Sequence, residues 1–439
     1  MAMLRKLRPG VAAAAAVIIL VALLIELPWW LMLILVMLLV PWMWLTRVGQ
    51  QAWLVTQVGI ATLPQRLGSS SVVVIGIAGV VGVLVGLLAM GAGFEATLEQ
   101  TGTDDTAIIV RGGAQNEINS MVDHDSAVVV SQAPQVLRNA RGQPIASPEL
   151  IVVASLRKKS SGLDANVEIR GVGERTWDLR PDIKIIAGRK LTSGMRELMV
   201  GQGARAQFSG ADLGSRLRLN GQSWTVVGVF DAGNSYNSEL WGDAAVVGSA
   251  YRRGSSTNSI IVRLTAAAAF EAFKARLTRD PRLKVDVRTT RDYYSQQSES
   301  LTHLIRILGV TVGVIMAIGA TFGALNTMYA AVAMRPRENA TLRAIGFRGV
   351  PVVVAVLLET MLLAVLGGVI GAAAAWVIFD NFTASTLGGN FSQVVFAFKV
   401  SPSLLWSGLK WALAIGFIGG LFPAMRAASM PVAAGLREL

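Results

Sequence analysis

The sequence predicts an α-helical membrane protein of about six spans, with a large α+β domain of two subdomains between the third and fourth spans. Three observations lead to this prediction. Apolar residues make up 53% of the chain, above the roughly 45–50% that is usual for soluble domains. Several apolar runs approach the roughly 20 residues that cross a bilayer as a helix. One long polar stretch, residues 94–300, separates these runs into two groups.

Six apolar runs are candidate spans: residues 11–27, 29–45, 71–92, 307–333, 351–379 and 403–422. The first two need a break between them, because residues 11–45 as one helix would be about 52 Å long, too long for one span. Pro28 suits a tight turn between two short helices. A removed signal peptide is the rival interpretation. The length of the apolar block and the absence of a small-residue cleavage site after it argue against that alternative.

The basic residues predict the orientation of these spans. Residues 94–300 hold 26 of the 40 basic and 23 of the 28 acidic residues, so most of the net charge of +12 lies on the short flanks of apolar segments. Such flanks favour the cytoplasmic side of a membrane, whereas a nucleic-acid partner would favour a basic patch on the polar domain. Six spans place the basic clusters near both termini and at residues 335–348 in the cytoplasm. The cytoplasmic basic residues are then Arg5, Lys6, Arg8, Arg47, Arg66, Arg335, Arg337, Arg343, Arg348, Arg426 and Arg437.

The predicted organisation follows from this order. Between the second and third spans, Trp53, Leu54 and Val58 alternate with polar residues, which predicts an amphipathic helix on the cytoplasmic membrane face; a short connector is the alternative. The predicted segments are an N-terminal hairpin (1–47), this helix (48–70), a span (71–93), the outer domain (94–300), a stalk and span (301–334), a cytoplasmic segment (335–350), two spans with a short outer loop (351–425) and a cytoplasmic tail (426–439).

The outer domain shows alternating, strand-like runs at residues 106–111, 126–131, 150–155, 166–171, 215–220, 224–230 and 259–264. Two stretches have a strand–helix–strand order, with predicted helices at 115–122 and 266–277. They flank a section, about 165–257, that is mostly strand. We therefore predict an α+β subdomain built from both flanks and a β-rich insertion between them.

The chain offers few residues for chemistry. It has no cysteine, and its two histidines, His124 and His303, lie far apart in sequence. Asp123-His124-Asp125 favours a solvated turn over a metal site, because adjacent side chains do not converge on one ion. Tyr236, Trp241 and Tyr251 favour packing over a ligand surface. The 439 residues contain no GxxxxGK[ST] phosphate loop. We expect a protein that is not an enzyme and binds no metal or cofactor itself.

Three stretches resemble one family. Asn326 begins the run NTMYAAVAMRPRENATLRAIGF, which resembles a cytoplasmic R-E-x-x-x-L-R-A-x-G segment, and Phe422 begins FPAMRAASMPVAAGLREL, which is similar to a P-A-x-x-A-A-x-x-x-P-x-x-A-L-R ending. The third stretch comprises residues 198–201 and 226–230, which look like β-rich segments of an outer domain. With the long domain between spans, these motifs resemble the MacB/FtsX-type ABC transporter permeases, a family that includes the lipoprotein-releasing LolC and LolE. The family core has four spans, so the N-terminal hairpin is additional.

The resemblance implies a permease subunit of the bacterial inner membrane that transmits the ATP-driven motion of a separate ATPase to a periplasmic domain, for export or lipoprotein handling. An FtsX-like regulator that activates a periplasmic cell-wall hydrolase without transport is the alternative. ATP and Mg²⁺ would then lie on the partner ATPase. A second permease, identical or not, and a periplasmic adaptor are further partners that the resemblance suggests. The coupling residues it implies are Arg335, Arg337, Glu338, Arg343, Gly346 and Arg348.

Two polar residues fall within predicted spans, Asn326 and Glu359. An acid inside a membrane is a functional candidate. For Glu359 we favour helix packing through a hydrogen bond over proton or ion handling. The nearby repeats Gly367-Gly368-x-x-Gly371 and Gly416-x-x-Gly419-Gly420 predict close helix approach.

Overall fold

The computed structural model describes residues 26–388, 390 and 392–431, without the side chains of Pro336, Arg337 and Asn339. The chain divides into two units. We call the first the helical unit; it comprises the described residues up to Ala89, Ile305–Asp380 and the residues from Lys399 on. The second, the α/β unit, comprises Met90–Leu304 and Asn381–Phe398. The predicted first span, residues 11–27, lies almost wholly outside the described residues.

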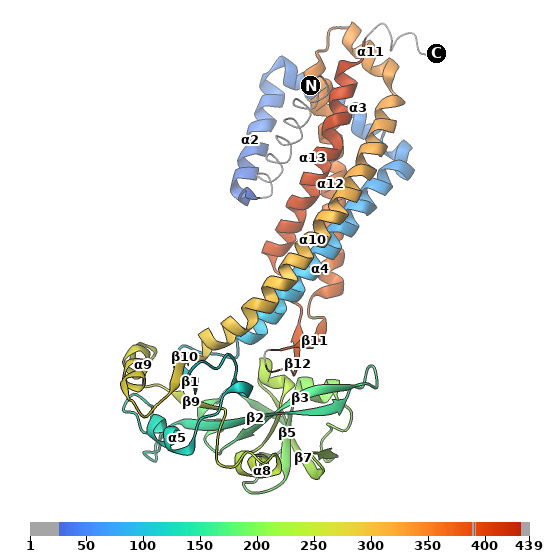
Figure 1. Cartoon of the computed structure of the whole chain (residues 1–439). Coiled ribbons are helices and arrows are strands. Elements are labelled where there is room, and N and C mark those ends of the chain that lie inside the picture. Colours follow the sequence, from blue (N-terminus) through green and yellow to red (C-terminus); the bar gives the residue numbers. More distant parts are fainter. Residues whose placement is uncertain (1–25, 389, 391, 432–439) are drawn as a thin grey trace, which may run out of the picture. The chain divides into compact units, whose positions relative to one another are not determined.

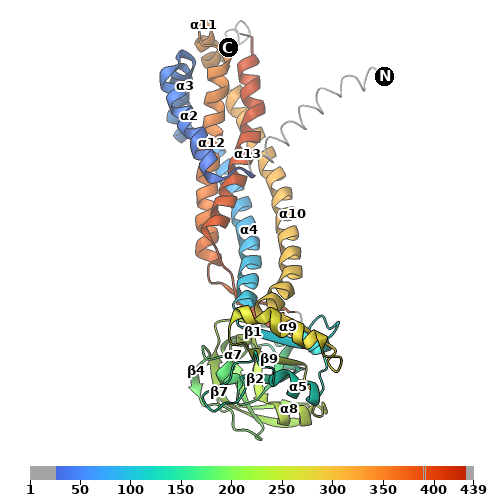
Figure 2. The same ribbon diagram turned by 90° about the vertical axis from the view of Figure 1, so that its left-hand side faces the viewer.

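Helices make up the helical unit (Figures 1 and 2). Its elements are α2 (Trp29–Leu45), α3 (Arg47–Ala61), η1 (Leu63–Arg66), α4 (Leu67–Glu99), α10 (Thr290–Ala333), α11 (Pro336–Ala344), α12 (Gly349–Phe379) and α13 (Pro402–Ser429). Four helices are long and apolar enough to cross a membrane: α4 together with η1, α10, α12 and α13. Helices α2 and α3 are long and apolar enough to cross a membrane only when they are counted together. The chain bends by 101° between them. The described chain therefore has four candidate spans, or five if the bent pair counts as one.

Helix packing in this unit depends on small residues. The buried residues of α3, which packs against α12, are Gly49, Ala52, Thr56 and Gly59. A Cβ atom added at Gly371 of α12 would collide with the backbone of Ala78 in α4, and one at Gly420 of α13 would collide with Thr360 of α12. The predicted close helix approach is confirmed at these two glycines.

One hydrogen-bonded sheet organises the α/β unit. Its strands are β1 (Thr106–Arg111), β2 (Ala146–Arg157), β3 (Asp164–Val172), β4 (Lys184–Gly188), β5 (Glu197–Gly201), β6 (Arg216–Leu219), β7 (Gln222–Asp231), β8 (Leu240–Asp243), β9 (Ser259–Arg263) and β10 (Val285–Thr289). They lie in the order β10-β1-β9-β2-β3-β8-β5-β7-β4, with β6 beside β7. The long strand β2 links the two predicted parts, because its start pairs with β9 and its remainder, Leu150 to Arg157, pairs with β3. The division into two subdomains stays a prediction.

Short helices surround the sheet: η2 (Glu117–Asn119), α5 (His124–Ser131), α6 (Thr176–Leu179), α7 (Gln202–Gln207), η3 (Ser235–Ser238), α8 (Ala244–Ala250), η4 (Ala267–Ala269) and α9 (Phe270–Arg279). The predicted strand–helix–strand order near 260–288 is confirmed by β9, α9 and β10. The predicted strand at 126–131 is wrong, because α5 occupies it: the Asp123 side chain caps the helix by accepting from the Ser126 N–H. The helix predicted at 115–122 is only the single turn η2.

The segment between α12 and α13 is more ordered than the short outer loop that the sequence suggested. Strands β11 (Thr383–Leu387) and β12 (Gln393–Ala397) form an antiparallel hairpin, which we call the β11–β12 hairpin. Its Val394 and Phe396 belong to a core of the α/β unit that also contains Phe94, Trp241 and Tyr294. Tyr236 and Trp241 are buried in the same core, which confirms packing as their role.

Candidate functional site

The predicted coupling segment is a short helix, α11, that follows α10 and precedes α12. Pro336 stands at its first turn, where a missing N–H costs no helical hydrogen bond. Glu338 in the first turn and Arg343 in the last complement the helix dipole. Gly346, with φ +103°, adopts a left-handed conformation just beyond the helix and lets the chain turn toward α12. The local sequence thus defines both ends of this helix.

Two of the predicted arginines bind within the chain. Arg335 donates to the Thr62 hydroxyl at the end of α3, and its Nε lies 3.8 Å from Glu338 Oε2. Arg343 donates to the backbone carbonyl of Met430, just after α13. Both ends of α11 are therefore attached to neighbouring elements of the helical unit.

The remaining predicted residues differ in exposure. The Glu338 side chain is 61% exposed, and Arg348, which precedes α12, is also exposed. The Arg337 side chain lies outside the described part of the structure. Asn326 lies on α10 with an exposed side chain. Glu338 and Arg348 are thus the charged residues of this set that are open to a partner.

A polar cluster joins η1 and α12 to Arg335, the residue that precedes α11. Arg66 of η1 donates to Glu359 of α12 at 2.9 Å, and both side chains are largely buried. The same guanidinium lies 3.4 Å from the Thr62 hydroxyl that Arg335 also binds. A cavity of about 40 Å³ lies among Arg66, Arg335 and Glu359. Glu359 therefore joins helices, as expected, but its partner is a cation that the sequence analysis used only to orient the spans.

A groove of about 650 Å³ lies between α3 and α11. Apolar side chains from both helices and their flanks line it, and Arg335 and Glu338 contribute the charged groups. The apolar lining consists of Leu54, Val55, Val58, Met334, Leu342 and Phe347. Apolar pockets that are rimmed by charged groups suit the anchor side chains of a protein partner. Neither the groove nor the contribution of α3 to it was predicted from the sequence.

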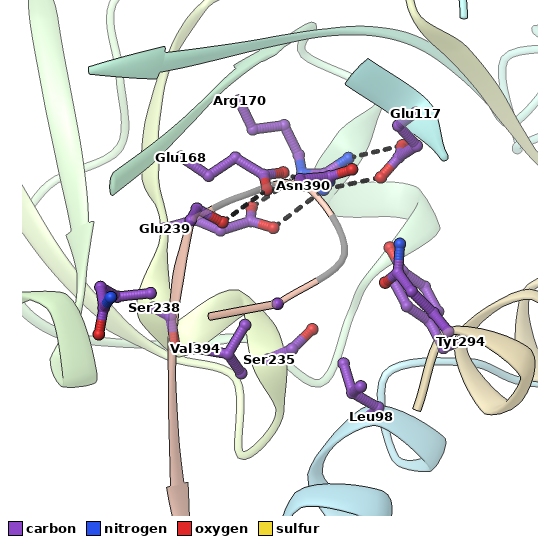
Figure 3. A pocket seen from close by; sticks show the side chains of 14 residues that line it. Leu98, Glu117, Glu168, Arg170, Ser235, Ser238, Glu239, Tyr294, Asn390 and Val394 are labelled. Atoms are coloured by element: carbon purple, nitrogen blue, oxygen red, sulfur yellow. Dashed lines mark hydrogen bonds and ion pairs between the residues drawn. The ribbon is translucent and has the colours of Figure 1, made fainter. Parts of the chain in front are cut away.

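A second group of functional side chains lies in the α/β unit, around Arg170 of β3 (Figure 3). The Arg170 side chain is 1% exposed and binds four carboxylates at 2.8–3.2 Å. These belong to Glu117, Glu149, Glu168 and Glu239. Arg180 adds a second guanidinium, 2.6 Å from Glu149. We call these six residues the Arg170 cluster.

The cluster holds more negative than positive groups, since four carboxylates face two guanidiniums. Burial raises the pKa of Glu168 to about 8, and the nearby Glu239 carboxylate adds to the rise. Burial by itself would also raise the pKa of Glu149, but the charges of Arg180 and Arg170 lower it below its ordinary value. Glu168 therefore holds a proton near neutral pH.

Sequence reasoning missed this cluster, although one signal was present. Glu168 and Arg170 stand two residues apart in a predicted strand, so their side chains point to the same face of the sheet. All five residues after Val167 in β3 are buried, so both faces of this part of the strand are covered. An acid and a base at alternate positions, among the apolar residues Val167, Ile169 and Val172, are the pattern that could have indicated a buried ion pair.

The part of the chain that the structure describes contains no group of three or more His, Asp and Glu residues placed to hold a metal ion. Asp123 of the Asp123-His124-Asp125 run instead caps α5.

Two family models match the chain. The MacB-like periplasmic core domain matches residues 70–280, and the FtsX-like permease C-terminal domain matches residues 310–432. The macrolide export ATP-binding/permease protein MacB of Neisseria meningitidis serogroup A is 25% identical over 289 residues, which are 61% of this chain and 43% of that protein. The MacB of Neisseria gonorrhoeae is 23% identical over 388 residues, 82% of this chain and 56% of that protein. This chain thus spans about half the length of these relatives.

Solved structures with some similarity include the periplasmic region of MacB from Actinobacillus actinomycetemcomitans. The matched region is 44% of this chain and 92% of the solved chain, at 18% identity and a TM-score of 0.33. A second is the extracellular domain of the noncanonic ABC-type transporter YknZ from Gram-positive bacteria. There the matched region is 42% of this chain and 100% of the solved chain, at 15% identity and a TM-score of 0.33.

Apolar helices that can cross a membrane, together with an α/β domain that matches a periplasmic core model, define a membrane permease with a periplasmic domain. The chain belongs to the MacB/FtsX-type family of ABC transporter permeases. The resemblance seen in the sequence motifs is thereby confirmed.

Proposed function

We propose that this chain is a permease subunit that transmits the motion of a separate ABC ATPase to its periplasmic domain. The observation that carries the proposal is the attachment of α11 at both ends. Arg335 binds the end of α3, and Arg343 binds the backbone beyond α13. A displacement of α11 therefore moves α3 and α13 as well as α10 and α12, which flank it in the chain.

The proposed path of motion leads along α10. This helix has 44 residues without interruption, from Thr290 to Ala333, and ends just before α11. Its first residues belong to the α/β unit, and the rest belong to the helical unit. A continuous helix resists compression and bending, so a push at its cytoplasmic end reaches the periplasmic domain without a hinge.

The proposed topology has six spans, both termini in the cytoplasm and an inner-membrane location. ATP and Mg²⁺ would bind to the partner ATPase, and a second permease would complete the membrane assembly, with a periplasmic adaptor as a further partner. The names of the relatives describe macrolide export. We extend to this chain only the class of activity, the export or handling of a substrate on the periplasmic side.

An FtsX-like role is the second candidate, and the match of residues 310–432 to the FtsX-like C-terminal model is compatible with both roles. In that case the same motion would activate a cell-wall hydrolase instead of moving a substrate. Capture of a periplasmic hydrolase by the purified permease–ATPase complex would distinguish the two, because a transporter of this kind needs no such enzyme.

Charge reversal at Glu338 tests the proposal. Glu338→Arg reverses an exposed carboxylate on α11 that lies 3.8 Å from Arg335, while the Arg335–Thr62 and Arg343–Met430 hydrogen bonds use other side chains. We expect it to lower the ATPase stimulation of a co-expressed ABC ATPase at least about tenfold, as for a charge pair at a protein interface. Glu299→Arg, an exposed carboxylate on the periplasmic end of α10, is the control and should stimulate normally. Unchanged stimulation with Glu338→Arg would contradict the role of α11.

A further inference from the structure

Three segments of the α/β unit meet at the Arg170 cluster. They are the last residues of α4, the first residues of α10 and the β11–β12 hairpin, and each leads directly into apolar helices of the chain. The hairpin connects α12 to α13, so these three segments together account for all four apolar helices. Each of these three segments contributes a residue to the cavity beside the cluster: Leu98 of α4, Tyr294 of α10 and Val394 of the hairpin.

The α4 segment lines the cavity beside the cluster with Leu98, and the α10 segment reaches the cluster through two tyrosines. Phe94 of α4 packs edge-on against Phe396 of the hairpin, with ring centroids 5.5 Å apart. From α10, the Tyr293 hydroxyl accepts from the backbone N–H of Glu117 at 2.9 Å. The Tyr294 hydroxyl lies 3.1 Å from that of Tyr236, which in turn accepts from Arg180.

The hairpin reaches the cluster through Glu168. One carboxylate oxygen of Glu168 accepts from Arg170 at 2.9 Å. The other accepts from the Asn390 amide at 3.0 Å and from the Ser392 hydroxyl at 3.3 Å. Glu168 is therefore the bridge between the sheet and the hairpin. Outside the cluster, Gln207 also holds the hairpin by donating to Ser385 at 2.9 Å.

Burial and the Glu239 carboxylate favour the neutral form of Glu168, whereas Arg170 and the Asn390 amide, as donors, favour its carboxylate. A cavity of about 30 Å³ lies beside it, and the Asn390 Oδ1 atom there is buried without a hydrogen-bond partner. With the Asn390 amide turned over, a protonated Glu168 can donate to this oxygen while still accepting from Arg170. The titratable or charged side chains that surround Glu168 in the cluster and its tyrosine shell are Glu117, Glu149, Arg170, Arg180, Tyr236, Glu239, Tyr293 and Tyr294. From the described hairpin residues, Asn390 and Ser392 face it, and neither titrates.

We propose that the Arg170 cluster is the junction that fixes the ends of the apolar helices to the periplasmic domain, with Glu168 and Asn390 as the positioning residues for the hairpin. This inference rests on the proposed function, because a junction matters only if motion passes through it. Loss of the Glu168–Asn390 contact loosens the hairpin, which the Gln207–Ser385 hydrogen bond and the packing of Phe396 still hold, while the sheet and the rest of the cluster remain.

The absence of cysteine from the sequence makes a clean cross-linking test available. Gln207→Cys with Ser385→Cys in the full-length membrane protein places a unique thiol pair across the docked hairpin, and a short bis-maleimide reports docking. We expect Asn390→Ala or Glu168→Ala to slow cross-linking roughly tenfold, the size expected from loss of one buried hydrogen bond to a polar carboxyl group. Thr383→Ala, an exposed hairpin position, is the control and should cross-link like the parent.

The pH profile separates positioning from bulk stability. With native Glu168 in the paired-cysteine background, cross-linking should fall as pH rises through the Glu168 pKa of about 8. Glu168→Gln in that background should cross-link equally well across this range, because it keeps both hydrogen bonds and does not titrate. The two proteins share the same thiol chemistry, so the ratio of their cross-linking rates reports the titration of Glu168 alone. A ratio that is constant with pH, or normal cross-linking in both Asn390→Ala and Glu168→Ala, would overturn the assignment.

Transmission is measured separately, in the complex with the ATPase. Asn390→Ala should assemble with the ATPase but lose most of the nucleotide-dependent change in the periplasmic domain. A loosened hairpin with full transmission would overturn the junction. If the parent protein itself couples to no ATPase, the proposed function fails, whereas the cross-linking result for the hairpin stands on its own.

Discussion

Asn390 and Glu168 lie 222 positions apart in the chain and share a buried hydrogen bond of 3.0 Å. This bond attaches the connection between α12 and α13 to the central sheet of the α/β unit. The β11–β12 hairpin is therefore a structural part of the periplasmic domain and not a loose link between two helices. The family assignment does not by itself indicate this attachment.

Glu168 should make the stability of the α/β unit depend on pH. Its pKa is about 8 in the folded protein, well above the ordinary value of 4.5, so the folded state holds a proton that the unfolded state has released. The stability contribution is complete below pH 4.5 and is lost as pH rises through about 8. We expect denaturant titrations between pH 5.5 and pH 8.5, values chosen to bracket this range, to show falling stability by up to a few kcal/mol, at about 1.4 kcal/mol per pH unit.

Glu168→Gln provides the control for that measurement, because an amide cannot release a proton. The slope of stability against pH should flatten in this variant. Glu149 does not interfere, since its lowered pKa confines its effect to more acidic solutions. An equal slope in the two proteins would contradict the protonated state assigned to Glu168.

The Arg66–Glu359 pair should stabilise the helical unit only as a pair. Glu359→Ala leaves a largely buried guanidinium without its carboxylate, which typically costs about 3–5 kcal/mol. We expect a clear fall in the melting temperature of the detergent-solubilised protein. The double variant Arg66→Met with Glu359→Leu should recover most of the loss, because no unpaired charge remains. Additive losses in the double variant would show that the two residues do not act together.

Helix packing can be tested at two helical glycines, one at a close helix contact and one in open space. Gly371→Ala should strongly reduce the yield, because its added Cβ atom would collide with the Ala78 backbone. Gly319→Ala is the matched control, since nothing lies within 4 Å of a Cβ atom there. It should be neutral or stabilising by up to about 1 kcal/mol, as for Gly to Ala within a helix. Comparable yields for both variants would contradict the close contact between α4 and α12.

The proposed six-span topology predicts where introduced thiols react. In intact cells, an impermeant maleimide should label Leu163→Cys, at an exposed position of the α/β unit. It should not label Ala344→Cys on α11 or Ala2→Cys at the N-terminus until the membrane is opened. Labelling of Ala2→Cys from outside would contradict an even number of spans before α4.

Much of the fold was predictable because its signals are local. Apolar runs of sufficient length predicted the regions of α4, α10, α12 and α13, and alternation predicted most strands of the sheet. The error at 126–131 also has a local cause. The valines there favour a strand, but the Asp123 cap and burial at helical spacing, at Ala127 and Val130, favour the helix.

The sites were less predictable, because they depend on pairings across long stretches of sequence. Arg66 and Glu359 are 293 positions apart, and each alone resembles an ordinary charged residue at a membrane end. The carboxylates around Arg170 come from η2, β2, β3 and the residue between η3 and β8, so no spacing motif unites them. The α11 segment was found because its residues are contiguous and resemble a known family motif.

The central claim is that motion of the ATPase passes through α11 to the periplasmic domain. Hydrogen–deuterium exchange on the permease–ATPase complex tests it most directly, by comparing nucleotide-free and ATP-trapped states. We predict a nucleotide-dependent change in residues 290–304 and in the β11–β12 hairpin, and its loss in Glu338→Arg while Glu299→Arg retains it. If the ATP-trapped and nucleotide-free complexes exchange identically throughout the α/β unit, although the ATPase is bound and active, the account is contradicted.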